Sequence, residues 1–300
     1  MTQYGSVAVM LSCVLALCWG RDNSSASLDF AEVHAKIVDT LDNIEAYEMT
    51  ASYSERTHKA KTSIIKMTAD IKMTSDCTTV LKFKKPDLLY INAVAKTARD
   101  AGNKKTVQDI AIYTTFDGKC QKFRSSVTTG DKTSTRSVVM DTSINTLEHP
   151  FDGWNLRGFG LSEGRDYIGT IRGLIVYYDF VSIGQKQNIA EFKGTFNADK
   201  CVAAFSEHMA LEQAQAFAEI SAGMVKDLRI RVDTTSHLVV GYTQIDTMAE
   251  RTCRFENIKI NPALNDNLFT FLSLPEEQFT DKTKTIKLAR EESPALLGAP

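Results

Sequence analysis

The stretch AYEMTASYSE, residues 46–55, decides the fold class, and SIIKMTADIKMT, residues 63–74, repeats its pattern. Both stretches alternate apolar and polar residues. The apolar set is Tyr47, Met49, Ala51 and Tyr53 in the first stretch and Ile65, Met67, Ala69, Ile71 and Met73 in the second. Because successive side chains of a strand point to opposite faces of a sheet, the pattern predicts long antiparallel strands with one apolar and one solvated face.

Turn signals and further alternating patterns predict more antiparallel strands along the chain. Residues 107–126, VQDIAIYTTFDGKCQKFRSS, are predicted to form a hairpin, because Asp117-Gly118 is the dipeptide that a type I′ turn prefers. TTGDKT, residues 128–133, marks a second turn. More strands are predicted in residues 179–196 and 224–262. A sheet of about ten antiparallel strands curls or closes.

Three segments have helical patterns instead. In residues 27–44, apolar residues fall at helical spacing, and Ser27 or Asp29 can act as the N-cap. A short helix is predicted from Asp166 onward. Residues 204–223 are predicted to form one further helix, because they are rich in Ala, Glu and Gln, and Gly223 is its expected stop signal. Its part near residues 206–222 looks like an insertion, which would form a lid or a partner surface.

Together these patterns predict a mainly β fold of the α+β class. We expect a curved antiparallel sheet that forms an incomplete β-barrel, with helices covering its concave face. Nothing in the sequence divides the chain into two domains. The predicted organisation is a signal peptide in residues 1–26, one domain in residues 27–281, and a flexible tail in residues 282–300.

The segment NPALNDNLFTFLSLPEEQFTD, residues 261–281, is apolar on both faces if it is a strand. Leu268, Leu272 and Leu274 would share one face, while Phe269 and Phe271 would occupy the other. Such a strand is expected to close the sheet, with the cavity or core on one side and a helix or lid on the other.

The N-terminus predicts export. GSVAVMLSCVLALCWG, residues 5–20, is an uncharged, mostly apolar run of signal-peptide length, and cleavage is expected after Gly20 or Ala26. The preceding MTQY contains no Lys or Arg, which is unusual for a signal peptide. The predicted location is therefore the periplasm or cell envelope, with a lipid-anchored form at Cys18 as the alternative.

Composition excludes several function classes. The chain of 300 residues has a formal net charge of −2, without the basic surface that a nucleic-acid partner requires. Four cysteines lie beyond the signal segment: Cys77, Cys120, Cys201 and Cys253. They could form two disulfides or remain as buried thiols, and the sequence favours neither alternative. No metal motif, phosphate loop or nucleophile elbow is present, so we expect neither an enzyme nor a cofactor.

The apolar face of the sheet has two interpretations. It is either an ordinary core filled by the helices, or a cavity for acyl chains that flexible methionines line. On the second interpretation the predicted lipid-lining residues are Tyr47, Met49, Tyr53, Ile65, Met67, Ile71, Met73, Phe269 and Phe271.

Three stretches, in order, resemble the LolA-type periplasmic lipoprotein carriers and related outer-membrane lipoprotein-sorting proteins. They are FKKPDLLYIN at residues 83–92, FDGKC at residues 116–120, and NIKINPALNDNLFTF at residues 257–271, followed by Pro275. The resemblance spans about residues 28–281. It implies an incomplete antiparallel barrel whose concave apolar surface is covered by helices.

The resemblance also implies reversible binding of lipoprotein acyl chains or another lipid, without a covalent step. Where the family has an arginine that ties the lid to the barrel, this chain has Lys85, so the lid contact is expected to be looser. The expected partners are a lipid or acylated lipoprotein and a membrane-bound donor or acceptor protein, with the chain itself a monomer. The alternative is an envelope sensor or interaction module on the same fold, without carrier activity.

Overall fold

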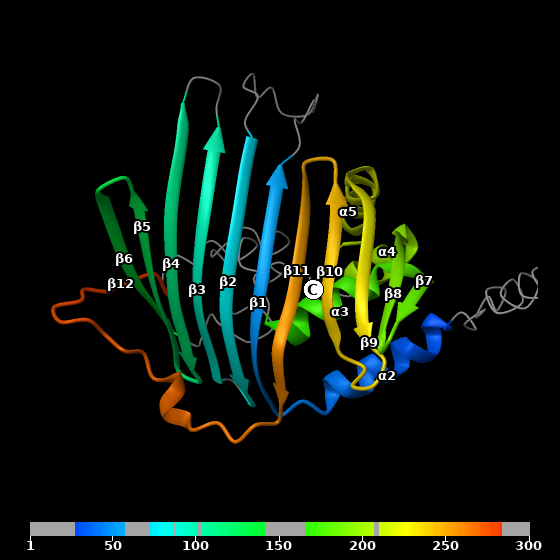
Figure 1. Cartoon of the computed structure of the whole chain (residues 1–300), viewed down its shortest axis with the longest axis horizontal. Coiled ribbons are helices and arrows are strands. Elements are labelled where there is room, and N and C mark those ends of the chain that lie inside the picture. The colour runs from blue at the N-terminus through cyan, green and yellow to red at the C-terminus, as the bar shows by residue number, and fades with distance from the viewer. Residues whose placement is uncertain are drawn as a thin grey trace, which may run out of the picture.

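The structure is a computed structural model, and it describes residues 28–57, 72–86, 88–100, 104–141, 166–206 and 210–283. One twelve-stranded sheet and four α-helices make up this part of the chain (Figure 1). The helices are α2 (Phe30–Asp42), α3 (Tyr167–Val176), α4 (Ala198–Ser206) and α5 (Leu211–Met224), with a short 3₁₀ helix η3 (Asp266–Phe269). The strands are β1 (Ala46–Thr57), β2 (Lys72–Lys84), β3 (Leu88–Asp100), β4 (Lys105–Asp117), β5 (Cys120–Thr129), β6 (Lys132–Asp141), β7 (Tyr178–Lys186), β8 (Ile189–Phe196), β9 (Val225–Asp233), β10 (Val239–Asp246), β11 (Ala249–Ile260) and β12 (Thr280–Asp281).

The sheet is open. Its strand order is β12-β6-β5-β4-β3-β2-β1-β11-β10-β9-β8-β7, so strands from the two ends of the chain meet where β1 pairs with β11. All neighbouring strands are antiparallel except β12 and β6, which are parallel. In the described part of the chain the two edge strands, β12 and β7, do not pair with each other. The predicted curved, incomplete barrel is therefore confirmed.

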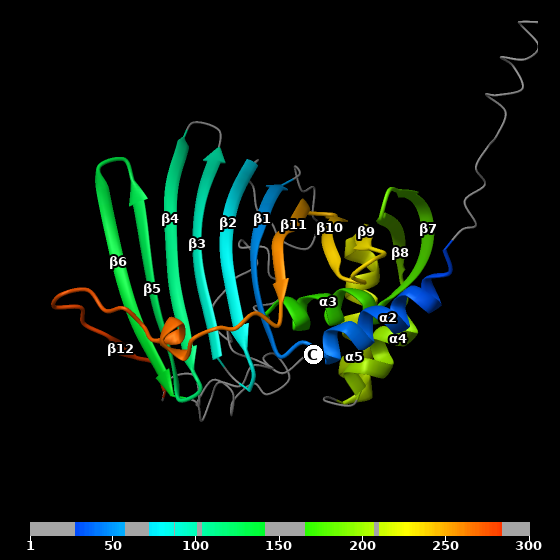
Figure 2. The same ribbon diagram turned by 60° about the horizontal axis from the view of Figure 1, so that its bottom comes forward.

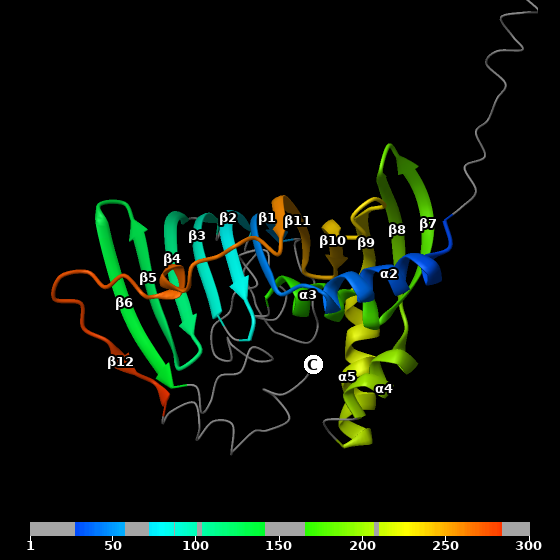
Figure 3. The ribbon, with the colours of Figure 1, turned by 90° about the horizontal axis from the view of Figure 1, so that it is seen from below.

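The helices lie on one face of the sheet, as Figure 3 shows. Helix α2 begins at the N-cap Asp29, one of the two predicted caps, and buries Val33, Ile37 and Leu41 against the core. Asp166 caps α3 by accepting a hydrogen bond from the Gly169 amide at 2.8 Å, so the predicted short helix is confirmed. Because this face of the sheet is apolar, both helices cover it with their own apolar residues.

The predicted hairpin between β4 and β5 is confirmed, but its turn is not type I′. The register pairs Phe116 with Gln121, so the central residues of the turn are Gly118 and Lys119. Gly118 has a φ of 79°, but Lys119 is not at positive φ, and a type I′ turn needs positive φ at both central residues. Instead, the Asp117 carboxylate accepts hydrogen bonds from the amides of Lys119 and Cys120 at 2.9 and 2.8 Å. The side chain thus supplies the turn contacts that the main chain supplies in a type I′ turn.

The helix predicted over residues 204–223 is wrong in its bounds. The structure has two helices in this region, α4 and α5, and α4 begins six residues earlier than predicted. The Asn197 side chain accepts a hydrogen bond from the Lys200 amide, and this contact caps α4. Gly223 lies inside α5 rather than after its end. Helix α5 ends at Met224, one residue after this glycine, so the predicted C-terminal end is correct to within one residue.

Two glycines give opposite predictions for stability. A Cβ on Gly241 would lie 2.6 Å from the Cys253 carbonyl oxygen, so we expect Gly241→Ala to lower the free energy of unfolding by about 1–3 kcal/mol. A Cβ on Gly223 would meet no atom within 4 Å, and Gly223→Ala is expected to raise that free energy by about 0.5–1 kcal/mol. Urea denaturation of both variants is the measurement. Equal effects would contradict the close strand approach at Gly241.

The C-terminal strap, residues 262–281, lies on the face of the sheet opposite the helices. Phe271 packs on the ring of Tyr113 at a centroid distance of 4.7 Å. Tyr113 alternates along β4 with Ile112 and Thr114, which are buried on the helix-covered face. Figure 2 shows the strap, in orange, passing from β11 across the ends of the strands toward β6.

The predicted strand in the strap is wrong. Residues 266–269 form η3, and the segment that follows has no regular structure until β12. The predicted separation of the two sets is present, since Phe269 and Phe271 are buried while Leu268, Leu272 and Leu274 are exposed. The expectation that a helix or lid covers the leucine face is therefore wrong. Phe271 is held by aromatic contacts with Tyr113 of β4 and Phe279 of the strap, so it is buried without strand pairing.

Candidate functional site

A cavity of about 290 Å³ lies between the sheet and the helices α3 and α5. We call it the interlayer cavity. Its sheet side is lined by Tyr53, Tyr178, Val225, Tyr242, Gln244, Asp246, Met248 and Arg251, and its helix side by Gly169, Gly173, Leu174, Tyr177, Phe217, Ile220, Ser221 and Met224. The lining is therefore largely apolar on the helix side and carries a few polar groups on the sheet side, as ligand cavities commonly do.

The strand register determines which side chains line the sheet side of this cavity. Tyr53 on β1 and Tyr242 on β10 both pair with Cys253 on β11. Residues opposite one another in a ladder share a face, so both tyrosines point to the helix-covered side. Gly169 and Gly173 on α3 and Tyr177 at its C-cap recur every four residues and lie on the same side of the helix. The two glycines leave room there because they have no side chain.

A network of ionised groups closes the sheet side of the cavity. Arg251 forms an ion pair with Asp246 and lies 3.6 Å, Nε to Oε2, from Glu55. The Tyr53 hydroxyl donates a hydrogen bond to Glu55 at 2.7 Å. Asp246 also accepts from the amides of Met248 and Ala249 at 2.6 and 2.7 Å. Each charged side chain of the network thus has an opposite charge beside it.

The network shifts two pKa values in opposite directions. Burial tends to raise the pKa of Asp246, but the hydrogen bonds from Arg251 and the two amides outweigh it and hold the pKa below its usual value. Burial raises the pKa of Tyr53, and the neighbouring Glu55 carboxylate raises it further. At neutral pH Asp246 is therefore ionised and Tyr53 carries its proton.

The rim of the interlayer cavity is apolar and exposed to solvent. Phe217, Ile220 and Met224 on α5 share one helix face and are 39%, 62% and 36% exposed. Met248, on the turn between β10 and β11, is 39% exposed. Exposed apolar residues that gather around a cavity are typical of binding sites for apolar ligands.

Of the nine residues predicted to line a lipid cavity, Tyr53 lines the interlayer cavity. Tyr47 and Met49 are buried in the packed core instead. Tyr47 stacks on Phe83 and contacts the Tyr167 ring edge-on. Its hydroxyl donates to Asp166 at 3.3 Å, and burial raises the pKa of that carboxyl. For Tyr47 and Met49 the structure matches the alternative of an ordinary core.

The other predicted lining residues lie elsewhere. Ile65, Met67 and Ile71 are outside the described residues. Met73, at the start of β2, is half-buried. Phe269 and Phe271 lie under the strap on the opposite face of the sheet, so they do not share a surface with Tyr53. Sequence alternation assigned them to one side of a strand, but only strand pairing decides which face of the sheet a distant segment covers.

Lys85 contacts the helix that precedes β1. Its ammonium donates to the Glu45 carboxylate at 2.9 Å and to the Asp42 carbonyl, the last residue of α2, at 3.3 Å. Lys85 thus connects the β2–β3 turn to the end of a covering helix. Its role as a lid contact stays a prediction. Both partners are exposed, and such a pair contributes little to stability.

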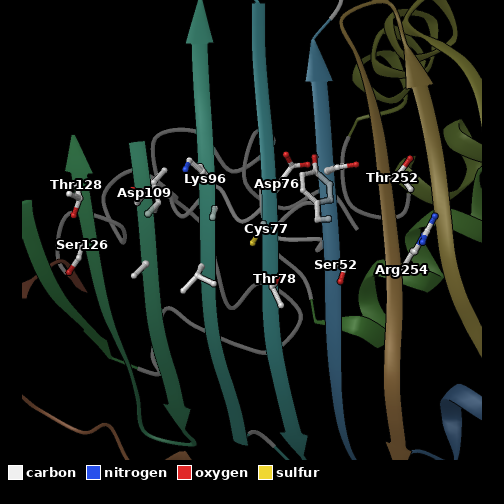
Figure 4. Close-up of a pocket in the computed structure, with 16 residues that line it drawn as sticks. Ser52, Asp76, Cys77, Thr78, Lys96, Asp109, Ser126, Thr128, Thr252 and Arg254 are labelled. Atoms are coloured by element: carbon white, nitrogen blue, oxygen red, sulfur yellow. The ribbon is translucent and has the colours of Figure 1, made fainter. Parts of the chain in front are cut away.

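A second, larger cavity lies on the face opposite the helices. It is an open groove of about 700 Å³ across β11, β1, β2, β3, β4 and β5. Figure 4 shows its polar side chains: Ser52, Asp76, Thr78, Lys96, Asp109, Ser126, Thr128, Thr252 and Arg254. These are the solvated positions of the alternating strands, and both signs of charge occur along the groove. Apolar residues such as Val94, which is 58% exposed, lie between these polar groups. An open groove with charges of both signs does not enclose an acyl chain.

In the described part of the chain, no group of three or more His, Cys, Asp and Glu is placed to hold a metal ion. Nor do the described helices include one long and apolar enough to cross a membrane.

The four cysteines are present as thiols. Cys77 and Cys253 lie on strands that flank Tyr53, so about 10 Å separates their backbones, too far for a disulfide. Burial raises the pKa of the Cys77 thiol to about 11.

Sequence reasoning missed the polar half of the interlayer cavity. Tyr242, Asp246 and Arg251 lie in a segment for which only strands were predicted. One signal was present, since Asp246 and Thr247 mark a turn between two strand patterns and Arg251 follows five residues later. That spacing brings a carboxylate and a guanidinium together across a hairpin, as β10 and β11 show.

Comparisons with known proteins give distant structural similarity. No family model matches the chain, and no curated protein matches it. The chain is similar to a beta-barrel-like protein of the domain of unknown function DUF1849 from Brucella abortus, with a TM-score of 0.29 and 10% identity over 73% of this chain and 99% of that chain. It is also similar to a domain assigned to outer membrane lipoprotein sorting from Vibrio parahaemolyticus, with a TM-score of 0.26 and 7% identity over 79% of this chain and 94% of that chain.

Proposed function

We propose that the protein binds the acyl chain of a lipid or of an acylated lipoprotein in the interlayer cavity, without a covalent step. The observation that carries this proposal is the cavity itself, about 290 Å³ in volume and rimmed by Phe217, Ile220, Met224 and Met248. Water has no polar partner at such a rim, so an apolar ligand gains free energy by covering it.

The volume limits the ligand. At about 30 Å³ for each water-sized group, the cavity accommodates roughly ten methylenes. Burial of each methylene contributes about 0.8 kcal/mol, so such a chain gains about 8 kcal/mol before the costs of ordering it. A longer chain leaves the cavity past the apolar face of α5. Release of a chain held this way is faster when a partner protein offers a second apolar site.

The place of action is part of the same proposal. The apolar run in residues 5–20 supports export, and we infer that the protein acts as a monomeric carrier in the periplasm or cell envelope. Its partners would be an acylated cargo and a membrane-bound donor or acceptor. The proposed activity is binding and transfer, with no catalytic step.

Substitution at the rim tests the proposal. We expect Ile220→Glu to weaken binding of a neutral fluorescent probe, N-phenyl-1-naphthylamine, by about tenfold, because the rim loses apolar area and gains a charge that binding would desolvate. Leu272→Glu is the matched control, since Leu272 is exposed on the strap, on the opposite face of the sheet. Probe fluorescence gives both affinities.

Two results would contradict the proposal. The first is a wild-type protein that binds no probe and carries no lipid mass when purified gently from its native envelope. The second is an equal loss of affinity in both variants, which would place probe binding outside the interlayer cavity.

A further inference from the structure

The hydroxyl of Tyr242 differs from those of Tyr47, Tyr53 and Tyr167. Tyr47 donates to Asp166, Tyr53 to Glu55, and Tyr167 to the Val239 carbonyl at 2.9 Å. Tyr242 is only 3% exposed, yet its hydroxyl has no hydrogen-bond partner among the described residues. This oxygen is not among the fully buried polar atoms that lack a partner in the described part of the chain, so it keeps some accessible surface. Because Tyr242 lines the interlayer cavity, its hydroxyl is available there to a bound molecule.

The position of Tyr242 directs that hydroxyl into the interlayer cavity. Tyr242 shares the helix-covered face of the sheet with Tyr53 and lines the cavity. The hydroxyl is the atom of a tyrosine side chain farthest from the strand, so it extends from the sheet toward α3 and α5. Burial raises the pKa of Tyr242 well above its ordinary value, and the hydroxyl therefore keeps its proton and acts as a donor at neutral pH.

The charges beside the cavity select against an anionic ligand. Asp246 and Arg251 line it, and Glu55 is paired with Arg251. These three groups sum to a formal charge of −1. Arg251 faces Asp246 with one nitrogen and Glu55 with another, so its charge is already opposed on two sides. A fatty-acid carboxylate would meet this network without an unopposed cation among the described lining residues.

We propose that the ligand of the interlayer cavity is an uncharged acyl ester or amide whose carbonyl oxygen accepts a hydrogen bond from the Tyr242 hydroxyl. This inference rests on the proposed function, which supplies the acyl chain, and adds the chemistry of its polar end. The apolar part lies against the helices α3 and α5. The carbonyl lies at the sheet, where the Tyr242 hydroxyl lines the cavity as a donor.

Two ligands with the same acyl chain test this inference. At pH 8 decanoate is ionised, whereas 1-decanoylglycerol is a neutral ester. Each is titrated against N-phenyl-1-naphthylamine bound to the purified protein. We expect the ester to displace the probe at a concentration at least tenfold lower than decanoate. Equal or stronger displacement by decanoate would overturn the inference.

Tyr242→Phe tests the donor itself. Because it removes one neutral hydrogen bond, we expect it to weaken binding of 1-decanoylglycerol by about fivefold to tenfold. The urea midpoint of the variant is measured alongside to establish that it is folded. Tyr90→Phe, which removes a hydroxyl from the opposite face, is the matched control. Unchanged ester affinity in Tyr242→Phe would overturn the inference.

The proposed function and this inference fail in different ways. Absence of probe binding to the wild-type protein would remove the acyl site, and with it the inference. Normal probe binding without an ester preference would leave the proposed function standing and overturn the inference alone. If Tyr242→Phe does not fold, the wild-type comparison of ester and carboxylate still decides.

Discussion

Replacing Tyr167 with alanine is expected to lower the free energy of unfolding by about 3–5 kcal/mol, the range typical of removing a large buried aromatic side chain. Tyr167 has no exposed surface. Its ring contacts Tyr47 on β1 and Phe255 on β11, and its hydroxyl donates to Val239 on β10. One side chain thus attaches α3 to three neighbouring strands.

The matched control is Tyr167→Phe, which keeps the ring and removes only the hydrogen bond. We expect it to lower the free energy of unfolding by about 1 kcal/mol. Urea denaturation followed by circular dichroism measures both variants. A loss below 1 kcal/mol in the alanine variant would show that α3 is not attached to the sheet in this way.

The second large effect is expected at Glu277, which holds the C-terminal strap. Its carboxylate accepts hydrogen bonds from Arg124 at 3.0 Å, from the Leu274 amide at 2.8 Å and from the Ser137 hydroxyl. The Glu277 side chain is 5% exposed, and that of Arg124 is 16% exposed. Removing the carboxylate leaves the arginine with little water and no counter-charge at that position, which is costly.

We therefore expect Glu277→Ala to destabilise attachment of the strap by about 2–3 kcal/mol, somewhat less than for a fully buried ion pair. Hydrogen exchange of the amides in residues 262–281 is the measurement, and protection there should fall while the long strands stay protected. Glu276→Ala is the control, because that neighbouring carboxylate is exposed. Equal exchange in both variants would contradict the role of Glu277.

Attachment of the strap should also depend on pH. Burial tends to raise the pKa of Glu277, but the hydrogen bonds from Ser137, Leu274 and Arg124 outweigh it and hold the pKa below its ordinary value of 4.5. A carboxyl whose pKa is lowered by folding contributes stability that is present above its unfolded pKa. This contribution is lost as pH falls from about 4.5 through the lower folded pKa. In Glu277→Gln the strap should not show this loss.

Local patterns predicted much of the fold because they depend on neighbours in the chain. The alternation around Tyr47 marked β1, and the cap and apolar spacing from Asp29 and Asp166 marked α2 and α3. Predictions failed where a contact from a distant element or a side chain decided the backbone. At Asp117 the carboxylate built a different turn, and at Phe271 a ring of β4 replaced strand pairing.

The candidate site was less predictable than the fold. Periodicity shows that Tyr47 and Tyr53 share a face of the sheet. It does not show that Tyr167 packs against Tyr47, whereas Tyr53 lines a cavity. Tyr242 was missed because an unsatisfied hydroxyl is not visible in sequence. It emerges only when the contacts around the hydroxyl are known.

The sequence by itself determined a mainly β chain with one apolar sheet face, because strand alternation is a property of successive residues. The tertiary structure alone decided three things: that β1 pairs with β11, that the strap crosses the solvated face, and that α3 and α5 leave an interlayer cavity above Tyr53 and Tyr242. These depend on register and packing between residues as many as about 200 positions apart. Periodicity within one segment does not encode such contacts.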